Sequence, residues 1–421
     1  MTGSRQVRPL AAPVDIRVRP PGSKSETIRA MAAAGMAEGR SHLYGGLDAG
    51  DPRAMEGALE AFGIGVDMSG DPWVIDGGGS RLHAPTGPLD AGESGLTARI
   101  VMAMAASAEG TTRIVGRGRL PERPMSGLID ALRAQGVEID GESLPLEVSG
   151  RGRLWGGQIH VDCAESSQHA TALMLVAPTM NQPVNLEITG LGGSAGYLGM
   201  TAATMRRFGA AVRETITGYE IETGGYHPGD VMIEPDASAA VYPMAVAAVT
   251  GGRATIEGLG RDSGQPDMRV AAILEEMGCE VSWESDSVVI DARDRRLRPV
   301  DVDLSGSPDG ALAVAVVCLV ADGQSRLRGL GSLRHKESDR LEAMKSELER
   351  LGGEVDAGED FLVVKGPATL RAATVDPHGD HRIAMSTALL GTIVPGVVVT
   401  HPDVVEKTWP GYWDFLDDLA G

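Results

Sequence analysis

The sequence predicts an α/β protein made of six copies of one strand-and-helix unit. Six segments start with a small polar or acidic residue and continue as an apolar helical pattern, and consecutive starts lie 69 to 73 residues apart. The starts are Ser25, Ser94, Ser167, Ser238, Asp309 and Asp380. Spacing this regular indicates an internal repeat. Because 421 residues exceed what one hydrophobic core usually holds, we expect two domains of about three units each.

Each unit is expected to contain two kinds of helix. The first kind, as in LTARIVMAMAAS and ALAVAVVCLVADG, is apolar on all sides and is therefore predicted to be buried. The second kind is amphipathic and ends at a glycine, namely at Gly63, Gly136, Gly209, Gly278 and Gly352. Two strands joined by a polar turn follow it, as in GGEVDAGEDFLVVKG. The unit thus reads strand, buried helix, strand, amphipathic helix and two strands. The sixth copy is expected to be cut short after WDFLDDLAG, as terminal repeats commonly are.

The composition excludes several classes of function. A net charge of −20 with 4% aromatic residues argues against a nucleic-acid-binding surface, which needs basic and stacking side chains. The longest apolar run, 311–321, is too short to span a membrane, and the first residues lack the apolar core of a secretory signal. The three cysteines, Cys163, Cys279 and Cys318, have no paired metal-ligand spacing. We therefore expect a reduced cytoplasmic protein that binds neither nucleic acid nor membrane.

Lysine is scarce in this chain, with five lysines beside thirty-three arginines. Three of the five stand in dense motifs: Lys24 in PPGSKSETIR, Lys336 in RHKESDR and Lys407 in EKTWPGY. A compact ammonium group approaches a phosphate as a point charge and can change its protonation, which a guanidinium group cannot. These three lysines are therefore candidates for an anion-binding site. Ordinary solvated lysines are the alternative interpretation.

The starts of the first three apolar helices carry groups that suit anions. A helix start offers unpaired backbone N–H groups and the positive end of the helix dipole. The residues concerned are Lys24, Ser25 and Arg29 in the first copy, Gly95 with the loop residue Arg123 in the second, and Ser166, Ser167 and Gln168 in the third. Simple helix caps and a solvated basic loop are the alternative interpretation.

The second half of the chain supplies candidate acids and bases. Asp309, at the start of an apolar helix, is a candidate general base, and Glu337 is a candidate proton carrier. For Asp339 and Asp380, a structural ion pair is the favoured interpretation. His381 has no second ligand at a metal-binding spacing, so no metal site is predicted.

Nine separated motifs follow one another along almost the whole chain, namely GSKSETIRA, ESGLTAR, LPERP, SSQ, SAGY, SPDGALA, KESDRL, GDHRIAM and EKTWPGY. In these motifs and their order, the chain resembles the 5-enolpyruvylshikimate-3-phosphate synthase family, also called 3-phosphoshikimate 1-carboxyvinyltransferase. The resemblance has several implications. It implies two inside-out α/β barrel domains of three βαβαββ-type repeats each, with the active site in the cleft between them. The expected domains are 1–21 with 235–421, and 22–234, with hinges near 20–22 and 233–236.

The resemblance also implies a reaction in the shikimate pathway of aromatic amino-acid biosynthesis. The enolpyruvyl group of phosphoenolpyruvate is transferred to the 5-hydroxyl of shikimate 3-phosphate by addition and elimination, without a cofactor. Asp309 would accept the hydroxyl proton, Glu337 would handle the methylene proton, and Lys24 would contact both substrates. Shikimate 3-phosphate would be held by Lys24, Ser25, Arg29, Ser166, Ser167, Ser194, Asp309, Ser332 and Lys336, with Tyr197 nearby. Phosphoenolpyruvate would be held by Lys24, Gly95, Arg123, Gln168, Arg340, Arg382 and Lys407. A monomer is the expected state.

The chain departs from the family pattern at five positions, which are Ile28, Gly50, Glu93, Leu96 and Ser332. One hypothesis is that Glu93 supplies near Lys24 the carboxylate that is lost at position 50. The departures keep open an enolpyruvyl transferase that acts on a different hydroxylated or phosphorylated acceptor. The related enzyme that acts on UDP-N-acetylglucosamine usually carries a loop cysteine, which GRGRLPERPM lacks. An RNA 3′-phosphate cyclase, which uses related repeats, is disfavoured by the charge of −20.

Overall fold

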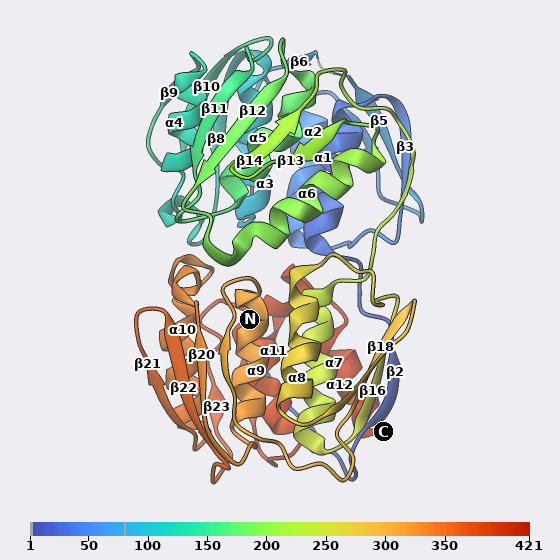
Figure 1. The fold of residues 1–421 in the computed structure, drawn as a ribbon, viewed down its shortest axis with the longest axis vertical. Coiled ribbons are helices and arrows are strands. Elements are labelled where there is room, and N and C mark those ends of the chain that lie inside the picture. The colour runs from blue at the N-terminus through green and yellow to red at the C-terminus, as the bar shows by residue number, and fades with distance from the viewer. Residues whose placement is uncertain (1–2, 80) are drawn as a thin grey trace. The chain divides into compact units, whose positions relative to one another are not determined.

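The chain folds into two compact units that are built alike (Figure 1). The computed structural model describes residues 3–79 and 81–421, and the side chain of Ser194 lies outside the described part. One unit, here called the terminal unit, comprises Met1–Pro21 and Pro235–Gly421. The other, the inserted unit, comprises Gly22–Glu234. Each unit has its own hydrophobic core.

The third copy in the inserted unit shows the repeat in its complete form. It runs through β11 (Gly157–Asp162), α5 (Gln168–Val176), β12 (Val184–Thr189), α6 (Ala195–Arg207), β13 (Val212–Glu214) and β14 (Gly218–Ile221). Its sheet has the order β11-β12-β14-β13, in which β11 and β12 are parallel and the other neighbours are antiparallel. This confirms the predicted unit, because a buried helix connects the two parallel strands and an amphipathic helix leads to the final pair.

The other copies follow the same plan. In the inserted unit, the first copy contains α1 (Lys24–Met36), β3 (Glu38–Tyr44), α2 (Gly50–Ala61), β4 (Gly65–Asp67), β5 (Trp73–Gly78) and the distant β15 (Asp230–Met232), and the second contains β6 (Leu82–His83), β7 (Leu89–Asp90), α3 (Gly95–Ala106), β8 (Ala108–Val115), α4 (Ser126–Ala134), β9 (Glu138–Asp140) and β10 (Leu146–Arg151). In the terminal unit, the fourth copy contains β2 (Asp15–Val18), α7 (Ala237–Thr250), β16 (Arg253–Glu257), α8 (Arg269–Glu276), β17 (Glu280–Trp283) and β18 (Ser287–Asp291). The fifth contains β19 (Asp301–Asp303), α9 (Ala311–Cys318), β20 (Gly323–Arg328), α10 (Arg340–Arg350), β21 (Glu354–Ala357) and β22 (Phe361–Gly366), and the sixth β23 (Thr374–Val375), α11 (His381–Gly391), β24 (Val398–Thr400), α12 (Tyr412–Ala420) and β1 (Ser4–Gln6).

Three sheets take a strand from a distant part of the chain. Strand β2 precedes α1 in sequence but pairs in parallel with β16, and β15 precedes α7 but pairs in parallel with β3. The first sheet of each unit is therefore completed by a strand that is distant in sequence. In the terminal unit this strand is β2, which precedes the inserted unit, and in the inserted unit it is β15, which stands at that unit's C-terminal end. In the sixth copy, β1 from the start of the described chain pairs antiparallel with β24 and completes the sheet. The sequence pattern predicts the shortened sixth copy but not the strand that completes its sheet.

The buried helices lie at the centre of each unit and the sheets lie around them (Figure 1). Helices α1, α3 and α5 pack against one another in the inserted unit, as α7, α9 and α11 do in the terminal unit. Every residue of α3, α9 and α11 is buried, as expected for helices that are apolar on nearly all sides. This arrangement confirms the inside-out α/β fold class. No helix in the described residues is long and apolar enough to cross a membrane.

Several helices begin at a different residue from the predicted one. Ser23 rather than Ser25 caps α1, with its hydroxyl accepting from the backbone N–H of Glu26. Asp236 caps α7 two residues before Ser238, and a short 3₁₀ turn, Pro308–Gly310, precedes α9. Ser23 and Asp236 have extended backbones, which lets their side chains fold back onto the first turn. A pattern of apolar residues does not reveal this backbone geometry.

In each unit, one backbone hydrogen bond joins the two segments that cross the unit boundary. In the terminal unit, the N–H of Asp236 donates to the carbonyl of Pro21 at 2.7 Å. In the inserted unit, the N–H of Ser23 donates to the carbonyl of Glu234 at 2.8 Å. The carboxylate of Glu26 also accepts from the N–H of Glu234 at 2.9 Å. These bonds fix each crossing segment to its own unit.

Gly22 stands at the start of the inserted unit, where the backbone is crowded. A Cβ atom at Gly22 would lie 2.1 Å from the carbonyl oxygen of Gly45, a backbone atom that no side-chain rotation can move. We expect Gly22→Ala to lower the free energy of unfolding by about 1–3 kcal/mol. The matched control is Gly57→Ala in α2, where the space is open and the better helix propensity of alanine should raise stability by about 0.5–1 kcal/mol. Urea unfolding measures both, and a Gly22→Ala protein as stable as its parent would contradict this explanation.

Candidate active site

Lys24, Ser25 and Arg29 lie together at the start of α1. The Lys24 ammonium is 3.2 Å from a carboxylate oxygen of Asp51. The Arg29 guanidinium donates to the carbonyl of Ser25 at 2.8 Å and to the hydroxyl of Thr201 at 2.8 Å. Burial lowers the pKa of Arg29 to about 10, because its hydrogen-bond partners are neutral oxygens. This buried cation is suited to meet an incoming anion.

Asp51 changes the interpretation of Glu93. Because Asp51 itself supplies a carboxylate to Lys24, the exchange hypothesis based on the sequence is not needed to explain the environment of this lysine. The Glu93 carboxylate lies beside Gly118, where a Cβ atom would be 2.9 Å from the nearer Glu93 oxygen. Gly118 has a φ of 58°, so a side chain there would be both strained and crowded. Glu93 thus packs against the loop that leads to Arg123.

Two guanidinium groups gather at the start of α3. A Cβ atom at Gly95 would lie 2.8 Å from the central carbon of Arg123 and 2.9 Å from Nη1 of Arg99. Ser94 caps the helix by accepting from the N–H of Thr97. Burial, with the nearby charge of Arg123, lowers the pKa of Arg99 to about 9. The absence of a side chain at Gly95 therefore lets two cations and a helix N-terminus converge, as an anion site requires.

The start of α5 is connected to the start of α3 through Arg99. Nη1 of Arg99 donates to Oε1 of Gln168 at 3.0 Å, which leaves the NH₂ group of Gln168 as the end that can donate elsewhere. The hydroxyl of Ser166 accepts from the N–H of Gln168 at 3.3 Å, and Ser167 is the N-cap residue without a side-chain cap bond. Arg29 donates weakly to Thr171 one turn further along α5, at 3.4 Å. The three helix starts of the inserted unit therefore form one polar cluster.

Two residues predicted from the resemblance lie beside this cluster. Tyr197 is in the first turn of α6, and its carbonyl accepts from the hydroxyl of Thr201 at 3.0 Å. The backbone of Ser194 lies in the short turn Gly192–Ser194 just before α6, while its side chain falls outside the described residues.

Asp309 stands among three cations in the terminal unit. One carboxylate oxygen lies 2.8 Å from Arg340 and 3.5 Å from Lys336, and the other lies 3.2 Å from Arg382. Burial alone would raise the pKa of Asp309, but Arg382, Lys336 and Arg340 together hold it well below its usual range. Asp309 is therefore an ionised carboxylate at neutral pH and can accept a proton.

Arg340 connects three carboxylates. It bonds Asp380 through two nitrogens, at 2.7 and 3.2 Å, and it reaches Asp309 at 2.8 Å and Glu337 at 2.9 Å. Burial opposes the charged form, but Asp380, Glu337 and Asp309 together raise the pKa of Arg340 above its usual value. Asp380 also caps α11, and Asp339 caps α10 and pairs with Arg334 at 2.7 Å. The structural ion pairs expected for Asp339 and Asp380 are thus confirmed.

Glu337 lies between two cations. One of its oxygens is 2.9 Å from Arg340 and the other is 3.2 Å from the ammonium of Lys407. A carboxylate held in this way has a neighbouring ammonium group with which it can exchange a proton. Ser332 lies in the preceding short turn, Gly331–His335, and is partly exposed.

The sequence pattern missed Asp267, which is almost fully buried next to this cluster. It accepts hydroxyl hydrogen bonds from Ser238 and from Ser307, the latter at 2.6 Å. Burial, with the charge of Asp309, raises the pKa of Asp267. One signal was available, because Asp267 lies 71 residues before Ser338 of the KESDR motif, the same interval that separates the helix starts.

The three cysteines lie in the hydrophobic interior rather than at this site. Burial raises the pKa of Cys163 and Cys279 to about 11 and that of Cys318 to about 12. Because the thiolate is the reactive form, we expect all three to resist a disulfide reagent at pH 8 in the native protein. The same protein in concentrated guanidinium should react at once and serves as the control. A thiol that reacts with the reagent as fast in the native protein as in the denatured one would contradict the prediction.

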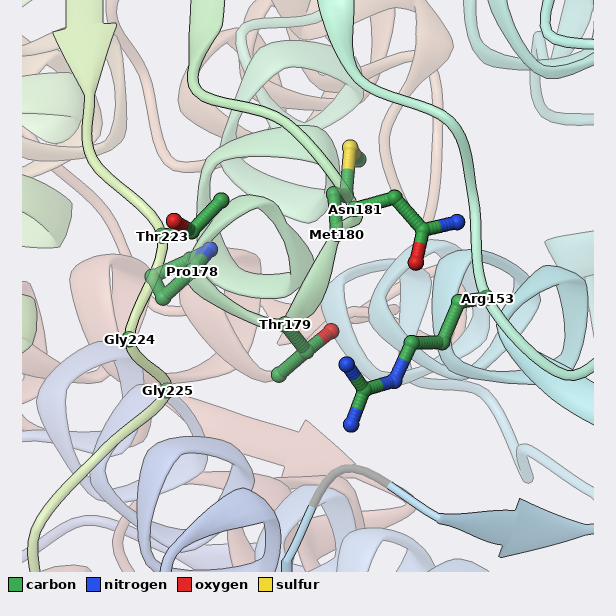
Figure 2. Close-up of a pocket in the computed structure, with 8 residues that line it drawn as sticks. All are labelled: Arg153, Pro178, Thr179, Met180, Asn181, Thr223, Gly224 and Gly225. Carbon is green, nitrogen blue, oxygen red and sulfur yellow. The ribbon is translucent and has the colours of Figure 1, made fainter.

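A pocket of about 340 Å³ lies elsewhere in the inserted unit (Figure 2). It is lined by Arg153, Pro178, Thr179, Met180, Asn181, Thr223, Gly224 and Gly225. These residues gather beyond the C-terminal end of α5, whereas Ser167 and Gln168 stand at its start. None of the predicted substrate residues lines the pocket. In the described part of the chain, no group of three or more His, Cys, Asp or Glu residues is arranged to hold a metal ion.

Comparisons with known proteins agree with this architecture and these motifs. Residues 10–416 match the sequence model of EPSP synthase (3-phosphoshikimate 1-carboxyvinyltransferase). Proteins named 3-phosphoshikimate 1-carboxyvinyltransferase from Serratia proteamaculans and Methanoculleus marisnigri are 36% and 37% identical; the first alignment covers 100% of this chain and 99% of the relative, and the second 96% of each. A solved EPSP synthase from Acinetobacter baumannii has a TM-score of 0.85 at 24% identity, covering 100% of this chain and 98% of that one.

The matched model and the relatives place the chain among the carboxyvinyltransferases, a class of transferase. More narrowly, the chain belongs to the EPSP synthase family. The fold is shared more widely, because the enolpyruvyl transferase NikO from Streptomyces tendae aligns with a TM-score of 0.80 at only 18% identity over 100% of this chain and 98% of that one.

Proposed function

We propose that this protein transfers the enolpyruvyl group of phosphoenolpyruvate to the 5-hydroxyl of shikimate 3-phosphate. The products are 5-enolpyruvylshikimate 3-phosphate and phosphate. The observation that carries the proposal is the cluster around Asp309, in which an ionised carboxylate is surrounded by Lys336, Arg340 and Arg382. A carboxylate of this kind can take a proton from a hydroxyl group while neighbouring cations hold anionic substrates. Family membership and relatives that match along nearly their whole length support the assignment.

The addition step forms a C–O bond at C2 and a C–H bond at C3, breaks the C2–C3 π bond and moves two protons. Asp309 accepts the proton of the 5-hydroxyl as its oxygen bonds to C2 of phosphoenolpyruvate. Glu337, protonated by exchange with the ammonium of Lys407, delivers its proton to C3, which becomes a methyl group. Lys407 and Arg340, at 3.2 and 2.9 Å from the Glu337 carboxylate, hold that group in place. The product of this step is a tetrahedral adduct.

The elimination step reverses the proton movement at C3. The bond between C2 and the phosphate oxygen breaks, C3 returns a proton to Glu337, and the double bond forms again. The proton that Asp309 took from the 5-hydroxyl leaves with the phosphate, so Asp309 is ionised again at the end of the cycle. Cations near the leaving phosphate stabilise the charge that develops on it. Lys24 is the third proposed catalytic residue. It is the first residue of α1, and Asp51, at 3.2 Å, orients its ammonium group at this anion-binding helix start.

The two anionic substrates are assigned to the helix starts and their cations. Shikimate 3-phosphate is proposed to contact Lys24, Ser25, Arg29, Ser166, Ser167, Ser194, Asp309, Ser332 and Lys336. Phosphoenolpyruvate is proposed to contact Lys24, Gly95, Arg123, Gln168, Arg340, Arg382 and Lys407. The convergence of Arg99 and Arg123 at Gly95 supports the second set, since a carboxylate or phosphate would neutralise these cations.

The proposal extends to how the protein works as a whole. The segments 20–22 and 233–236 are proposed as hinges, because the backbone hydrogen bonds at Pro21 and Ser23 fix the chain on either side of the crossing. The protein is proposed to act as a monomer in the cytoplasm, without nucleic acid, membrane, metal or cofactor.

The test is phosphate release from phosphoenolpyruvate in the presence of shikimate 3-phosphate, with no metal or nucleotide added. Release should require both substrates, and mass spectrometry should detect the enolpyruvyl ether. Release from well-folded protein with another hydroxylated or phosphorylated acceptor, and none with shikimate 3-phosphate, would favour the alternative acceptor. The departures at Ile28, Leu96 and Ser332 are the reason for that comparison.

A further inference from the structure

Asp267 is a buried acid without a role in the proposed reaction. It lies in the short turn Pro266–Met268 between β16 and α8, and its relative exposure is 2%. Each of its two oxygens accepts a hydroxyl hydrogen bond, one from Ser238 and one from Ser307. Burying a carboxyl group is costly unless it is hydrogen-bonded, and here two hydroxyl groups offset that cost. These bonds place Asp267 beside the starts of α7, α8 and α9, which indicates a role in holding them together.

The two serines connect Asp267 to Asp309 by separate routes. Ser307 stands two residues before Asp309 and leads into the turn Pro308–Gly310 that carries it. Ser238 is in the first turn of α7, and its carbonyl accepts from Arg382 at 3.2 Å. Arg382 in turn lies 3.2 Å from the Asp309 carboxylate. Asp267 thus connects to the turn that carries Asp309 and to one of its cations.

The turn that carries Asp309 is also packed tightly against Asp267. A Cβ atom at Gly310 would lie 2.6 Å from Val270, 3.2 Å from the Ser307 hydroxyl oxygen and 3.4 Å from an Asp267 carboxylate oxygen. Only glycine leaves room for the turn to approach this closely. The hydrogen bond from Ser307 to Asp267 is therefore supported by packing on the same side of the turn.

We propose that Asp267 is a positioning residue for Asp309, which fixes the turn carrying Asp309 to the start of α7 and places a second acidic group beside it. This inference rests on the proposed role of Asp309 as general base. The fixed turn keeps the base at hydrogen-bonding distance from a substrate hydroxyl, where a small displacement is costly. The second acidic group opposes the cations around Asp309 and keeps it basic enough to accept a proton.

The electrostatic surroundings agree with this second effect. Arg382, Lys336, Arg340 and Glu337 act electrostatically on Asp309, and Arg382 is in turn influenced by Tyr242 and Asp236 as well as by both acids. Burial raises the pKa of Asp267 and the charge of Asp309 raises it further, and like charges act on each other reciprocally. Without Asp267, the cations would stabilise the ionised form of Asp309 still more and make it a weaker base.

The next repeat places a polar residue at the same position. Ser338 lies 71 residues after Asp267, and its hydroxyl donates to Asp380 at 3.1 Å. In both copies, the residue at this position reaches the start of the buried helix in the following copy. The contact is thus a regular feature of the repeat, and the fourth copy has a carboxylate where the fifth has a hydroxyl.

The test is to separate kcat from KM in Asp267→Asn, which keeps the size of the side chain and removes its charge. We expect kcat to fall about 10- to 100-fold, the range expected when a catalytic group is slightly displaced. The KM values for both substrates should stay within about twofold of the parent, since Asp267 contacts neither substrate in the proposal. Ser307→Ala, which removes one hydrogen bond and no charge, should lower kcat in the same direction by a smaller factor.

The matched control is Asp262→Asn, an exposed acid in the same loop, which should leave both constants unchanged. Circular dichroism and thermal unfolding establish that each variant is folded, and if Asp267→Asn does not fold, Ser307→Ala decides the question. A kcat within about twofold of the parent in the deciding variant would overturn the inference, as would a loss confined to KM.

Asp309→Ala separates this inference from the proposed reaction. If Asp309→Ala loses turnover while Asp267→Asn keeps it, the general base stands and the positioning role is wrong. If Asp309→Ala keeps turnover, the assignment of Asp309 fails and the role of Asp267 fails with it. If both variants lose kcat at unchanged KM, both assignments are supported.

Discussion

Replacing Asp309 with alanine should reduce kcat for phosphate release by about 100- to 10,000-fold, the usual contribution of a general base. Arg382, Lys336 and Arg340 hold the pKa of this carboxyl group well below its usual range despite its burial, so it is ionised and ready to accept a proton at neutral pH. The fold should survive the change, because Arg340 keeps its bonds to Asp380 and Glu337. Steady-state assays and thermal unfolding of the same preparation measure the two effects.

Asp309→Asn adds a stricter comparison, because it keeps the shape of the side chain while it removes the charge and with it the ability to accept a proton. Its kcat should fall as far as that of Asp309→Ala. The control is Asp301→Asn on β19, whose exposed carboxylate pairs with Arg328 at 2.7 Å and should leave turnover unchanged. An asparagine variant that retains a tenth or more of the parental kcat would show that Asp309 is not the base.

The repeat architecture could be predicted because burial leaves a strong signal in the sequence. Helices such as α9 and α3 are enclosed on every side, so they carry apolar residues without a polar stripe. The glycines that end the amphipathic helices were also visible, and Gly63, Gly136 and Gly209 have φ values between 80° and 84°, which favour glycine. These signals lie within a single segment, and no knowledge of the rest of the chain is needed to use them.

The features that could not be predicted depend on contacts between distant segments. Strand β15 stands at the C-terminal end of the inserted unit, far from β3 in sequence, yet it completes the sheet of β3, and nothing in its three residues specifies that partner. The cap of α1 is Ser23 rather than Ser25, because the choice depends on backbone angles. Local sequence patterns therefore predict the individual helices and strands, whereas the pairing of strands from distant segments depends on tertiary contacts.

The residues of the candidate site also differ in whether local sequence or long-range contacts reveal them. Lys24, Asp309 and Glu337 stand in dense motifs, so their residue types and neighbours marked them as candidates. Asp267 stands in GQPDMRV, where nothing nearby marks it, and its importance follows from hydrogen bonds to serines 29 and 40 residues away in sequence. Arg99 is visible as a helix residue, but its bond to Gln168 spans 69 residues. Residues that hold a site together are therefore harder to find from sequence than residues that act in it.

Replacing Arg340 with methionine should lower the free energy of unfolding by about 3–5 kcal/mol, the range measured when one partner of a buried ion pair is removed. Asp380 has no exposed surface, and Arg340 neutralises it through two hydrogen bonds at 2.7 and 3.2 Å. Without Arg340, its negative charge would remain buried without that partner. Urea unfolding measures the loss, and Arg328→Met, which breaks an exposed pair with Asp301, is the matched control with an expected change of at most about 1 kcal/mol.

A double variant tests the cause of this loss. Arg340→Met combined with Asp380→Asn removes the uncompensated charge but keeps a residue that caps α11 well. It should therefore be more stable than Arg340→Met alone, even though it carries one more substitution. Turnover should remain low in both variants, because Arg340 also bonds Asp309 and Glu337. If the double variant is less stable than the single one, the destabilisation comes from lost packing around Arg340 rather than from the buried charge of Asp380.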